Sequence, residues 1–191
     1  LGHAPAVALS CAKDGSKMAI AESLTNIVWA PLQEGLKSVS LSANWMWPCK
    51  NEGEDARLYD AVEAVSDFAC DLGINIPTGK DSLYMVQKYK DEKVYSPGTV
   101  IITASGHVSD VRKIVEPVMV NDEDTSLLLV DFSNDKFSLG GSSLAQVLNQ
   151  VGDETPTVAD TDYGARAFDS VQNLIKQGLV LAGHDVSAGG L

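Results

Sequence analysis

Long apolar runs are missing from this sequence, and so is a basic N-terminal stretch followed by an apolar one. A membrane-spanning helix needs about 20 consecutive apolar residues. The sequence therefore predicts no such helix, and it predicts no secretory signal peptide. Cysteine is also scarce: Cys11, Cys49 and Cys70 are odd in number and far apart. They fit neither a disulfide framework nor a zinc ribbon, so we expect a cytoplasmic protein with reduced thiols.

Basic residues are few as well. Fourteen Lys and Arg residues stand against 26 Asp and Glu residues, which gives a net charge of −12. Such a surface repels nucleic-acid backbones and anionic membranes, so neither is an expected partner. A small phosphorylated ligand fits only if a metal ion screens its charge. The three histidines, His3, His107 and His184, are scattered, and none pairs with a cysteine. We expect no covalent catalysis, and in particular no glutamine hydrolysis, in this chain.

Met18–Leu32 is the stretch around which the rest of the chain is organised. Its apolar residues recur at helical spacing, and the opposite side is nearly as apolar, which predicts a buried helix. Glu22 and Asn26, one turn apart, then lie in or beside the interior. A buried carboxylate needs a cation, a hydrogen-bond network or a proton. A magnesium site and a hydrogen-bonded core residue both remain open here.

Hydrophobic periodicity predicts an α+β or mixed α/β fold, with helices on one face of a mixed or antiparallel sheet. The most regular helix is Asp55–Leu72, closed by Gly73. Val39–Trp47 alternates between an apolar face and a face of small polar residues, as a half-buried strand does. The other expected strands are Ala6–Ala12, a hairpin of Leu83–Tyr89 with Val94–Ser96, and a central Thr99–Val108.

A second unit is expected after the polar stretch Ser109–Asp124, where we place a domain boundary. Its expected elements, in chain order, are a buried strand Leu127–Val130, a helix from Gly140-Gly141-Ser142-Ser143 to Val151, a helix Asp162–Gln177 and a strand Leu179–Ala182.

Two further motifs carry polar groups suited to phosphate or metal. Asp185 and Ser187 follow the last expected strand, where they either cap a helix or hold a metal ion and a phosphate. Gly79-Lys80-Asp81-Ser82 looks like the tail of a P-loop. Ile74 stands where that motif needs its first glycine, and a strand follows, so a Walker A site is rejected. Lys80 either offers its charge to a phosphate or pairs with Asp81.

Five strings of residues carry a resemblance to a known family. They are Ala21-Glu22-Ser23-Leu24-Thr25-Asn26, Leu41-Ser42-Ala43-Asn44-Trp45-Met46, Gly53-Glu54-Asp55-Ala56, Gly79-Lys80-Asp81-Ser82-Leu83 and His184-Asp185-Val186-Ser187-Ala188-Gly189-Gly190-Leu191. In this order, over essentially the whole chain, they resemble the large single-chain phosphoribosylformylglycinamidine synthase family. The sequence reads as a piece of such a longer chain.

The resemblance implies a fold and a set of ligands. In the family, two aminoimidazole-ribonucleotide-synthetase-like halves each combine an A domain with a B domain. By this resemblance, residues 1–112 are part of the second A domain and residues 118–191 begin the second B domain. Glu22, Asn26 and Asp185 match the family's Mg²⁺ ligands. Ser187 matches a contact to the bound nucleotide, ATP or ADP, and Lys80 is assigned to the same nucleotide.

The resemblance also implies a reaction for the intact enzyme, the ATP- and glutamine-dependent conversion of formylglycinamide ribonucleotide to the amidine in purine biosynthesis. Its partners would be the remaining domains of the same chain, glutaminase included. We expect this chain alone to be inactive. A sheet edge that normally meets the twin half is compatible with a homodimer. The alternatives are a structural or dimerisation module without a ligand site, and a selenophosphate- or hydrogenase-maturation-type enzyme of the same superfamily.

Overall fold

The computed structural model describes residues 1–187 and 190 of the chain. Its centre is a three-stranded sheet in the order β2-β1-β5, made of β2 (Asn75–Ser82), β1 (Val39–Met46) and β5 (Thr99–Gly106). Strand β1 runs parallel to β2 and antiparallel to β5. The expected mixed sheet is therefore confirmed. The central strand is β1, however, because β5 meets only an isolated bridge at Gly2 on its other side, so the central place predicted for Thr99–Val108 is wrong.

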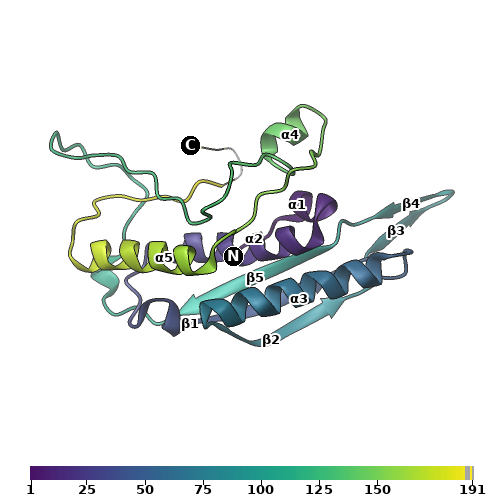
Figure 1. Cartoon of the computed structure of the whole chain (residues 1–191), viewed down its shortest axis with the longest axis horizontal. Coiled ribbons are helices and arrows are strands. Elements are labelled where there is room, and N and C mark those ends of the chain that lie inside the picture. Colours follow the sequence, from purple (N-terminus) through teal and green to yellow (C-terminus); the bar gives the residue numbers. More distant parts are fainter. Residues whose placement is uncertain (188–189, 191) are drawn as a thin grey trace.

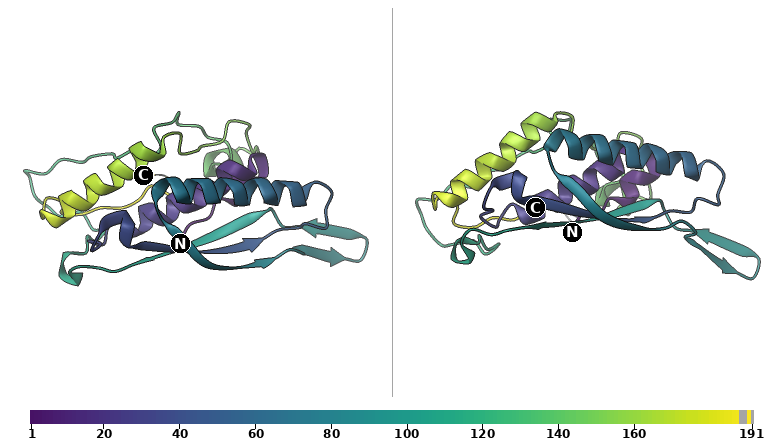
Figure 2. Two further views of the ribbon diagram at one scale, coloured as in Figure 1. Left: turned by 60° about the horizontal axis from the view of Figure 1, so that its bottom comes forward. Right: turned by 90° about the horizontal axis from the view of Figure 1, so that it is seen from below.

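Helices cover one face of this sheet. They are α2 (Ala12–Ile27), α3 (Glu54–Leu72), α5 (Thr161–Lys176) and the 3-10 turn η1 (Gly35–Ser38). The strands form the lower layer in the left view of Figure 2, with these helices above them. Alternation along β1 explains the arrangement: Val39, Leu41 and Ala43 are buried in the helix-facing core, and the residues between them are only half-buried. Predicted helices on one face and a small-polar opposite face are both confirmed.

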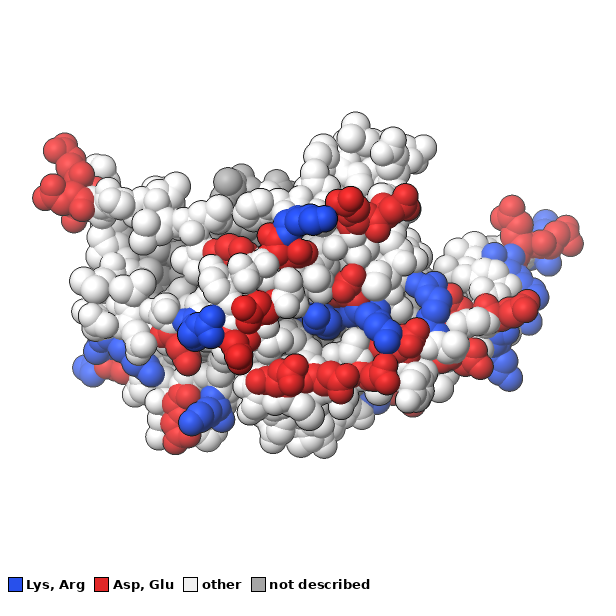
Figure 3. Space-filling model, viewed as in Figure 1, with Lys and Arg blue, Asp and Glu red and all other residues white. Residues whose placement is uncertain are grey.

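Helix α3 matches its prediction closely. It begins at Glu54 after Gly53 and ends at Gly73, whose φ of 68° is the left-handed conformation that glycine adopts at helix ends. Acidic side chains dominate its exposed surface, and a row of them crosses the lower part of the molecule in Figure 3. The negative net charge is thus displayed on the helix face that points away from the core.

The N-terminal segment is helical where a strand was expected. Helix α1 (Pro5–Ser10) replaces the strand predicted over Ala6–Ala12, and α2 begins directly afterwards at Ala12. Proline suits the first turn of a helix, since it lacks the N–H that would be unpaired there, and the alanines that follow favour helix over strand. The strand predicted over Ala6–Ala12 is therefore wrong.

Beyond β2, a hairpin extends away from the sheet, as expected. It consists of β3 (Val86–Tyr89) and β4 (Glu92–Tyr95), which pair antiparallel around a turn at Lys90. In Figure 1 it projects from the end of the molecule opposite η1. Strand β2 ends at Ser82, so the strand predicted over Leu83–Tyr89 is shorter and forms only its second half.

The second half of the chain has less regular structure than predicted. After the 3-10 turn η2 (Val111–Lys113), Leu127–Val130 forms no strand within the described residues, and Leu127 is 87% exposed. Leu179–Ala182 forms none either, and helix α4 covers only Ser143–Val147 rather than reaching Val151. An apolar run becomes a strand only when a neighbouring strand pairs with it. The described residues supply no such neighbour here, so both strand predictions are wrong. The predicted helix is present as α4 but ends four residues early.

Helix α5 is confirmed and packs onto the first half of the chain. Phe168, Val171 and Ile175 join the main apolar core with residues of α2, η1 and β1.

Within the described residues, no helix combines the length and apolar character that crossing a bilayer requires.

Candidate functional site

The site begins where the N-terminus crosses helix α2. Gly2 exchanges two backbone hydrogen bonds with Ile102 of β5, at 2.8 and 2.9 Å. It also lies directly on the helix: a Cβ atom at Gly2 would be 2.1 Å from the carbonyl oxygen of Ala19. Only glycine allows this close approach. The approach carries the next residue, His3, over the exposed side of α2.

Glu22 is the centre of this cluster. Its Oε2 accepts a hydrogen bond from the backbone N–H of His3 at 2.9 Å, and the His3 ring Nδ1 lies 3.7 Å from the same oxygen. The other carboxylate oxygen, Oε1, accepts a hydrogen bond from the Ser187 hydroxyl at 3.1 Å. Residues 165 positions apart in the sequence therefore meet at this carboxylate. The structure brings the first and last of the five family strings together.

Of the two positions predicted for Glu22, in the interior or beside it, the structure shows the second. Its side chain is 27% exposed, and Asn26 one turn later is exposed. Ile20 and Leu24, two residues before and after Glu22, lie on the opposite, buried side of α2. Helix α2 ends at Ile27. At Glu22, the exposed side of the helix is contacted by the N-terminal residue His3 and by Ser187. The carboxylate is thus held at the surface by hydrogen bonds rather than sunk in the core.

Asn26 and Asp185 lie beside this cluster. The Asn26 amide nitrogen donates to the carbonyl oxygens of Glu22 at 2.8 Å and Leu1 at 3.2 Å. Asp185 is two residues before Ser187, and its side chain is only 11% exposed. Its Oδ1 lies 3.3 Å from Nδ1 of His184. Positions 188, 189 and 191 of the C-terminal motif lie outside the described residues.

The side chains of this cluster carry the oxygen atoms that a hard cation prefers, but these atoms are not grouped as a metal site requires. Two carboxylates and a side-chain amide are oxygen donors of the kind that Mg²⁺ prefers, with phosphate and water completing its shell. Among residues 1–187 and 190, however, no three His, Cys, Asp or Glu side chains are grouped closely enough to hold a metal ion by themselves. A metal here would need oxygen atoms from a ligand as well.

Lys80 lies apart from the other predicted residues. It sits on β2, at the opposite edge of the sheet from β5, where α2 packs. Its ammonium group donates to the Ser82 hydroxyl at 3.1 Å and is exposed. No hydrogen bond or ion pair in the described part of the chain connects Lys80 with Glu22 or Ser187. The structure therefore joins Glu22 to Ser187 and leaves Lys80 outside that cluster.

The cysteines give no sign of a nucleophile. Cys11, Cys49 and Cys70 are free. Burial raises the pKa of the Cys49 thiol, and the neighbouring carboxylates of Asp55, Glu54 and Asp81 raise it further. A reactive cysteine needs the opposite, a pKa lowered by nearby positive charge. Cys49 is therefore protonated at neutral pH and unsuited to covalent catalysis.

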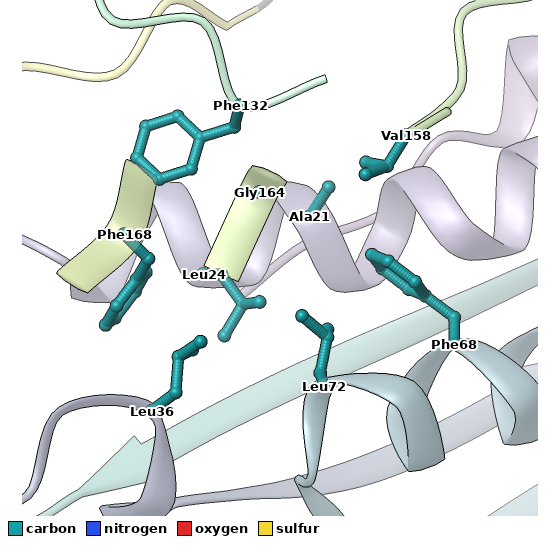
Figure 4. Close-up of a pocket in the computed structure, with 9 residues that line it drawn as sticks. All are labelled: Ala21, Leu24, Leu36, Phe68, Leu72, Phe132, Val158, Gly164 and Phe168. Atoms are coloured by element: carbon teal, nitrogen blue, oxygen red, sulfur yellow. The ribbon is translucent and has the colours of Figure 1, made fainter. Parts of the chain in front are cut away.

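Two hollows lie elsewhere and do not compete with the Glu22 cluster. Figure 4 shows the first, an apolar gap of about 20 Å³ among α2, α3, η1 and α5. Phe132 and Val158 close it on one side, and Phe68 and Leu72 on the other. A gap of this size holds about one water at most and offers no polar partner, so it is a packing defect in the core. The second is an open groove of about 540 Å³, lined only by residues between Phe137 and Glu154.

Comparison with known families decides the chain's family. The family model described as "FGAR-AT PurM_N-like domain" matches residues 1–107, more than half of the chain. The chain belongs to this family. As an FGAR-AT PurM_N-like chain, it contains in its matched part α2, α3 and the whole three-stranded sheet, and therefore Glu22, Asn26 and Lys80.

Curated relatives of this FGAR-AT PurM_N-like chain carry one name. A protein of Arabidopsis thaliana, named as a probable chloroplastic/mitochondrial phosphoribosylformylglycinamidine synthase, is 43% identical over 192 residues. A probable phosphoribosylformylglycinamidine synthase of Caenorhabditis elegans is 39% identical over 202 residues. Each alignment covers all of this chain but only 14% and 15% of those proteins. The chain thus spans about a seventh of the length of the curated relatives it matches.

A solved structure shares the fold. The T. maritima PurL protein, solved in complex with ATP, superposes with a TM-score of 0.53 at 10% sequence identity. The match covers 99% of this chain and 26% of that one. The PurL-type fold, mixed α/β as predicted, is therefore confirmed for this chain. The identity is too low to transfer individual residues.

Sequence reasoning missed one residue of the cluster. His3 was set aside as one of three scattered histidines, yet its backbone N–H holds Glu22. The only available signal was Gly2, since a glycine before a polar residue permits a close approach to another backbone. Which backbone Gly2 approaches is decided by the tertiary structure.

Proposed function

We propose that this chain is the section of a phosphoribosylformylglycinamidine synthase that contributes a Mg²⁺–nucleotide site. The observation that carries the proposal is the 3.1 Å hydrogen bond between Ser187 and Glu22. It joins the two strings that match the family's metal and nucleotide motifs. The names of the curated relatives support the enzyme, and the ATP complex of the structural neighbour supports the nucleotide.

Each residue then has a defined part in binding. Glu22, Asn26 and Asp185 present oxygen atoms to Mg²⁺, and Ser187 presents its hydroxyl to the nucleotide. The bound ion offsets the negative charge of the phosphates. That matters here, because the surrounding net charge of −12 would otherwise repel ATP or ADP. Lys80 contacts the nucleotide only if the ligand extends to β2, or if another part of the intact protein closes over it.

In the intact enzyme, ATP activates the amide oxygen of formylglycinamide ribonucleotide. Ammonia, released from glutamine in a separate glutaminase domain, displaces that oxygen to give the amidine, ADP and phosphate. This chain supplies no catalytic residue to that reaction. Its part is to hold the metal and the nucleotide in place. Cytoplasmic localisation remains a prediction.

Thermal denaturation with and without Mg·ADP tests the proposal. A ligand at about 100 times its dissociation constant stabilises the folded state by about 2.7 kcal/mol. We expect the wild-type chain to gain that stability and Glu22→Gln to gain much less, since the carboxylate charge is lost. Glu52→Gln, which changes an exposed carboxylate at the loop before α3, is the matched control and should behave as wild type. ADP with EDTA should give little stabilisation.

A structural module is the competing function, and one observation favours it. The sheet face opposite the helices has no covering element in the described structure (Figure 2). Ser40, Ser42 and Asn44, which alternate with the buried residues of β1, are half-buried. Such a face suits pairing with the twin half, or with a second copy of this chain as a homodimer. Absence of any Mg·ADP effect on wild type, or an equal effect on Glu22→Gln, would favour this module over the nucleotide site.

A further inference from the structure

The turn after helix α2 contains a tryptophan that contacts the far end of the site. Trp29 lies two residues beyond the last helical residue, Ile27, and its ring packs on Gly183. A Cβ atom built on Gly183 would lie 2.0 Å from Cζ3 of the Trp29 ring. The backbone of Gly183 does not have a positive φ, so alanine is excluded there by space alone. The ring and the chain are in direct van der Waals contact.

Backbone hydrogen bonds also hold Trp29 and Gly183 in position. The N–H of Val115 donates to the carbonyl of Trp29 at 3.0 Å, and the N–H of Gly183 donates to the carbonyl of Glu116 at 3.1 Å. Three segments far apart in sequence therefore meet at Trp29. Its indole Nε1 is buried and finds no acceptor among the described residues. A buried donor without a partner is unfavourable, so the shape of the ring rather than its N–H explains its place.

The two contacts lie at opposite ends of one short stretch. Residues 183–187 run from Trp29 back to Glu22, antiparallel to α2. Helix α2 ends at Ile27, and Trp29 follows two residues later in the turn. Three residues lie between Gly183 and Ser187, so at most about 13 Å of chain links the two contacts. Asp185 is the middle residue of this stretch.

We propose that Trp29 is a positioning residue for the Mg²⁺–nucleotide site. By seating Gly183, it sets the position of Asp185 and the register in which Ser187 reaches Glu22. Because only three residues separate the two contacts, a displacement at Gly183 is carried to Ser187. That the ligand is Mg²⁺ with a nucleotide rests on the proposed function. The placement of residues 183–187 by Trp29 is a property of the chain even without ligand.

Two measurements test it separately. Hydrogen–deuterium exchange of residues 183–187 reports positioning without ligand, and the dissociation constant for Mg·ADP reports its consequence. Gly183→Ala should speed exchange in this stretch and weaken Mg·ADP binding at least tenfold. Trp29→Phe, which removes the far edge of the ring, should have a smaller effect of the same kind. The double variant should recover much of both losses, because the added methyl replaces the ring edge.

A matched control exists in the same molecule. Gly98 packs on Trp47, and a Cβ there would lie 2.3 Å from that ring. Gly98→Ala should lower thermal stability but leave both the exchange of residues 183–187 and the Mg·ADP affinity unchanged. Unchanged exchange at 183–187 in both Gly183→Ala and Trp29→Phe would overturn the inference. If exchange responds as expected but wild type does not bind Mg·ADP, the proposed function fails while the positioning role stands.

Discussion

At the scale of single residues, Gln172 binds several buried backbone groups, a role that no motif in the sequence indicated. It lies on α5 with 2% of its surface exposed. Its amide nitrogen donates to the carbonyls of Val28 and Ala30 at 2.6 and 2.9 Å, and its oxygen accepts from the N–H of Leu32 at 2.8 Å. These backbone groups belong to the end of α2 and the turn after it, where a helix leaves its carbonyls unpaired. One side chain therefore closes the helix that carries Glu22.

Gln172→Leu should destabilise the fold by about 3 kcal/mol, since several buried backbone groups lose their only side-chain partner. Chemical denaturation monitored by circular dichroism measures this change. Asn173→Ala, on the exposed side of the same helix turn, is the control and should fall within about 0.5 kcal/mol of wild type. A loss for Gln172→Leu no larger than for the control would show that the capping role is wrong.

At the scale of elements, helices α1 and α2 hold a neighbouring segment with three side chains. Ser10 donates to the carbonyl of Gly152 at 2.9 Å, Asp14 accepts from the Thr155 hydroxyl at 2.7 Å, and Lys17 donates to the carbonyl of Val158 at 3.0 Å. Ser10 is the last residue of α1, and Asp14 and Lys17, three residues apart, lie on one face of α2. These three hydrogen bonds attach residues 152–158 to the first half of the chain.

Asp14→Ala combined with Thr155→Val should loosen this segment without disturbing the sheet. The lost hydrogen bond is charge-assisted but partly exposed, so we expect a cost of about 1 kcal/mol. Hydrogen–deuterium exchange should rise across residues 150–158 and stay unchanged in β1. Asp67→Ala, an exposed carboxylate of α3, serves as the control. Equal exchange in the double variant and wild type would contradict the attachment.

At the scale of the whole molecule, the chain spans about a seventh of the curated relatives it matches. An ammonia-dependent synthase assay on the 191-residue chain should show no turnover. On the proposed function, this chain holds Mg²⁺ and the nucleotide, and the groups that act on the amide substrate belong to the rest of the intact enzyme. Clear formation of the amidine by this chain alone would contradict this prediction. A wild-type chain that binds Mg·ADP serves as the positive control for folding.

Local chemistry was enough to predict several elements. The sequence alone determined α3 with its closing glycine, the two-faced strand β1, the hairpin β3–β4 and helix α5, since their periodicity agrees with where they lie. It also determined the acidic surface seen in Figure 3. Pairing with a distant strand is not local, which is why Leu127–Val130 and Leu179–Ala182 were misread as strands.

For the candidate site, the sequence indicated which residues take part, and the tertiary structure determined which of them lie close together. Glu22, Asn26, Asp185 and Ser187 were all named from motifs. That Glu22 is 27% exposed, and that Ser187 rather than Lys80 reaches it, depends on how the chain returns along α2. The contacts of Gly2, Gly183 and Gln172 set that path. The contacts of Gly2 with Ile102, of Gly183 with Trp29 and of Gln172 with Val28 join residues at least 100 positions apart, and no short-range pattern in a sequence encodes such distances.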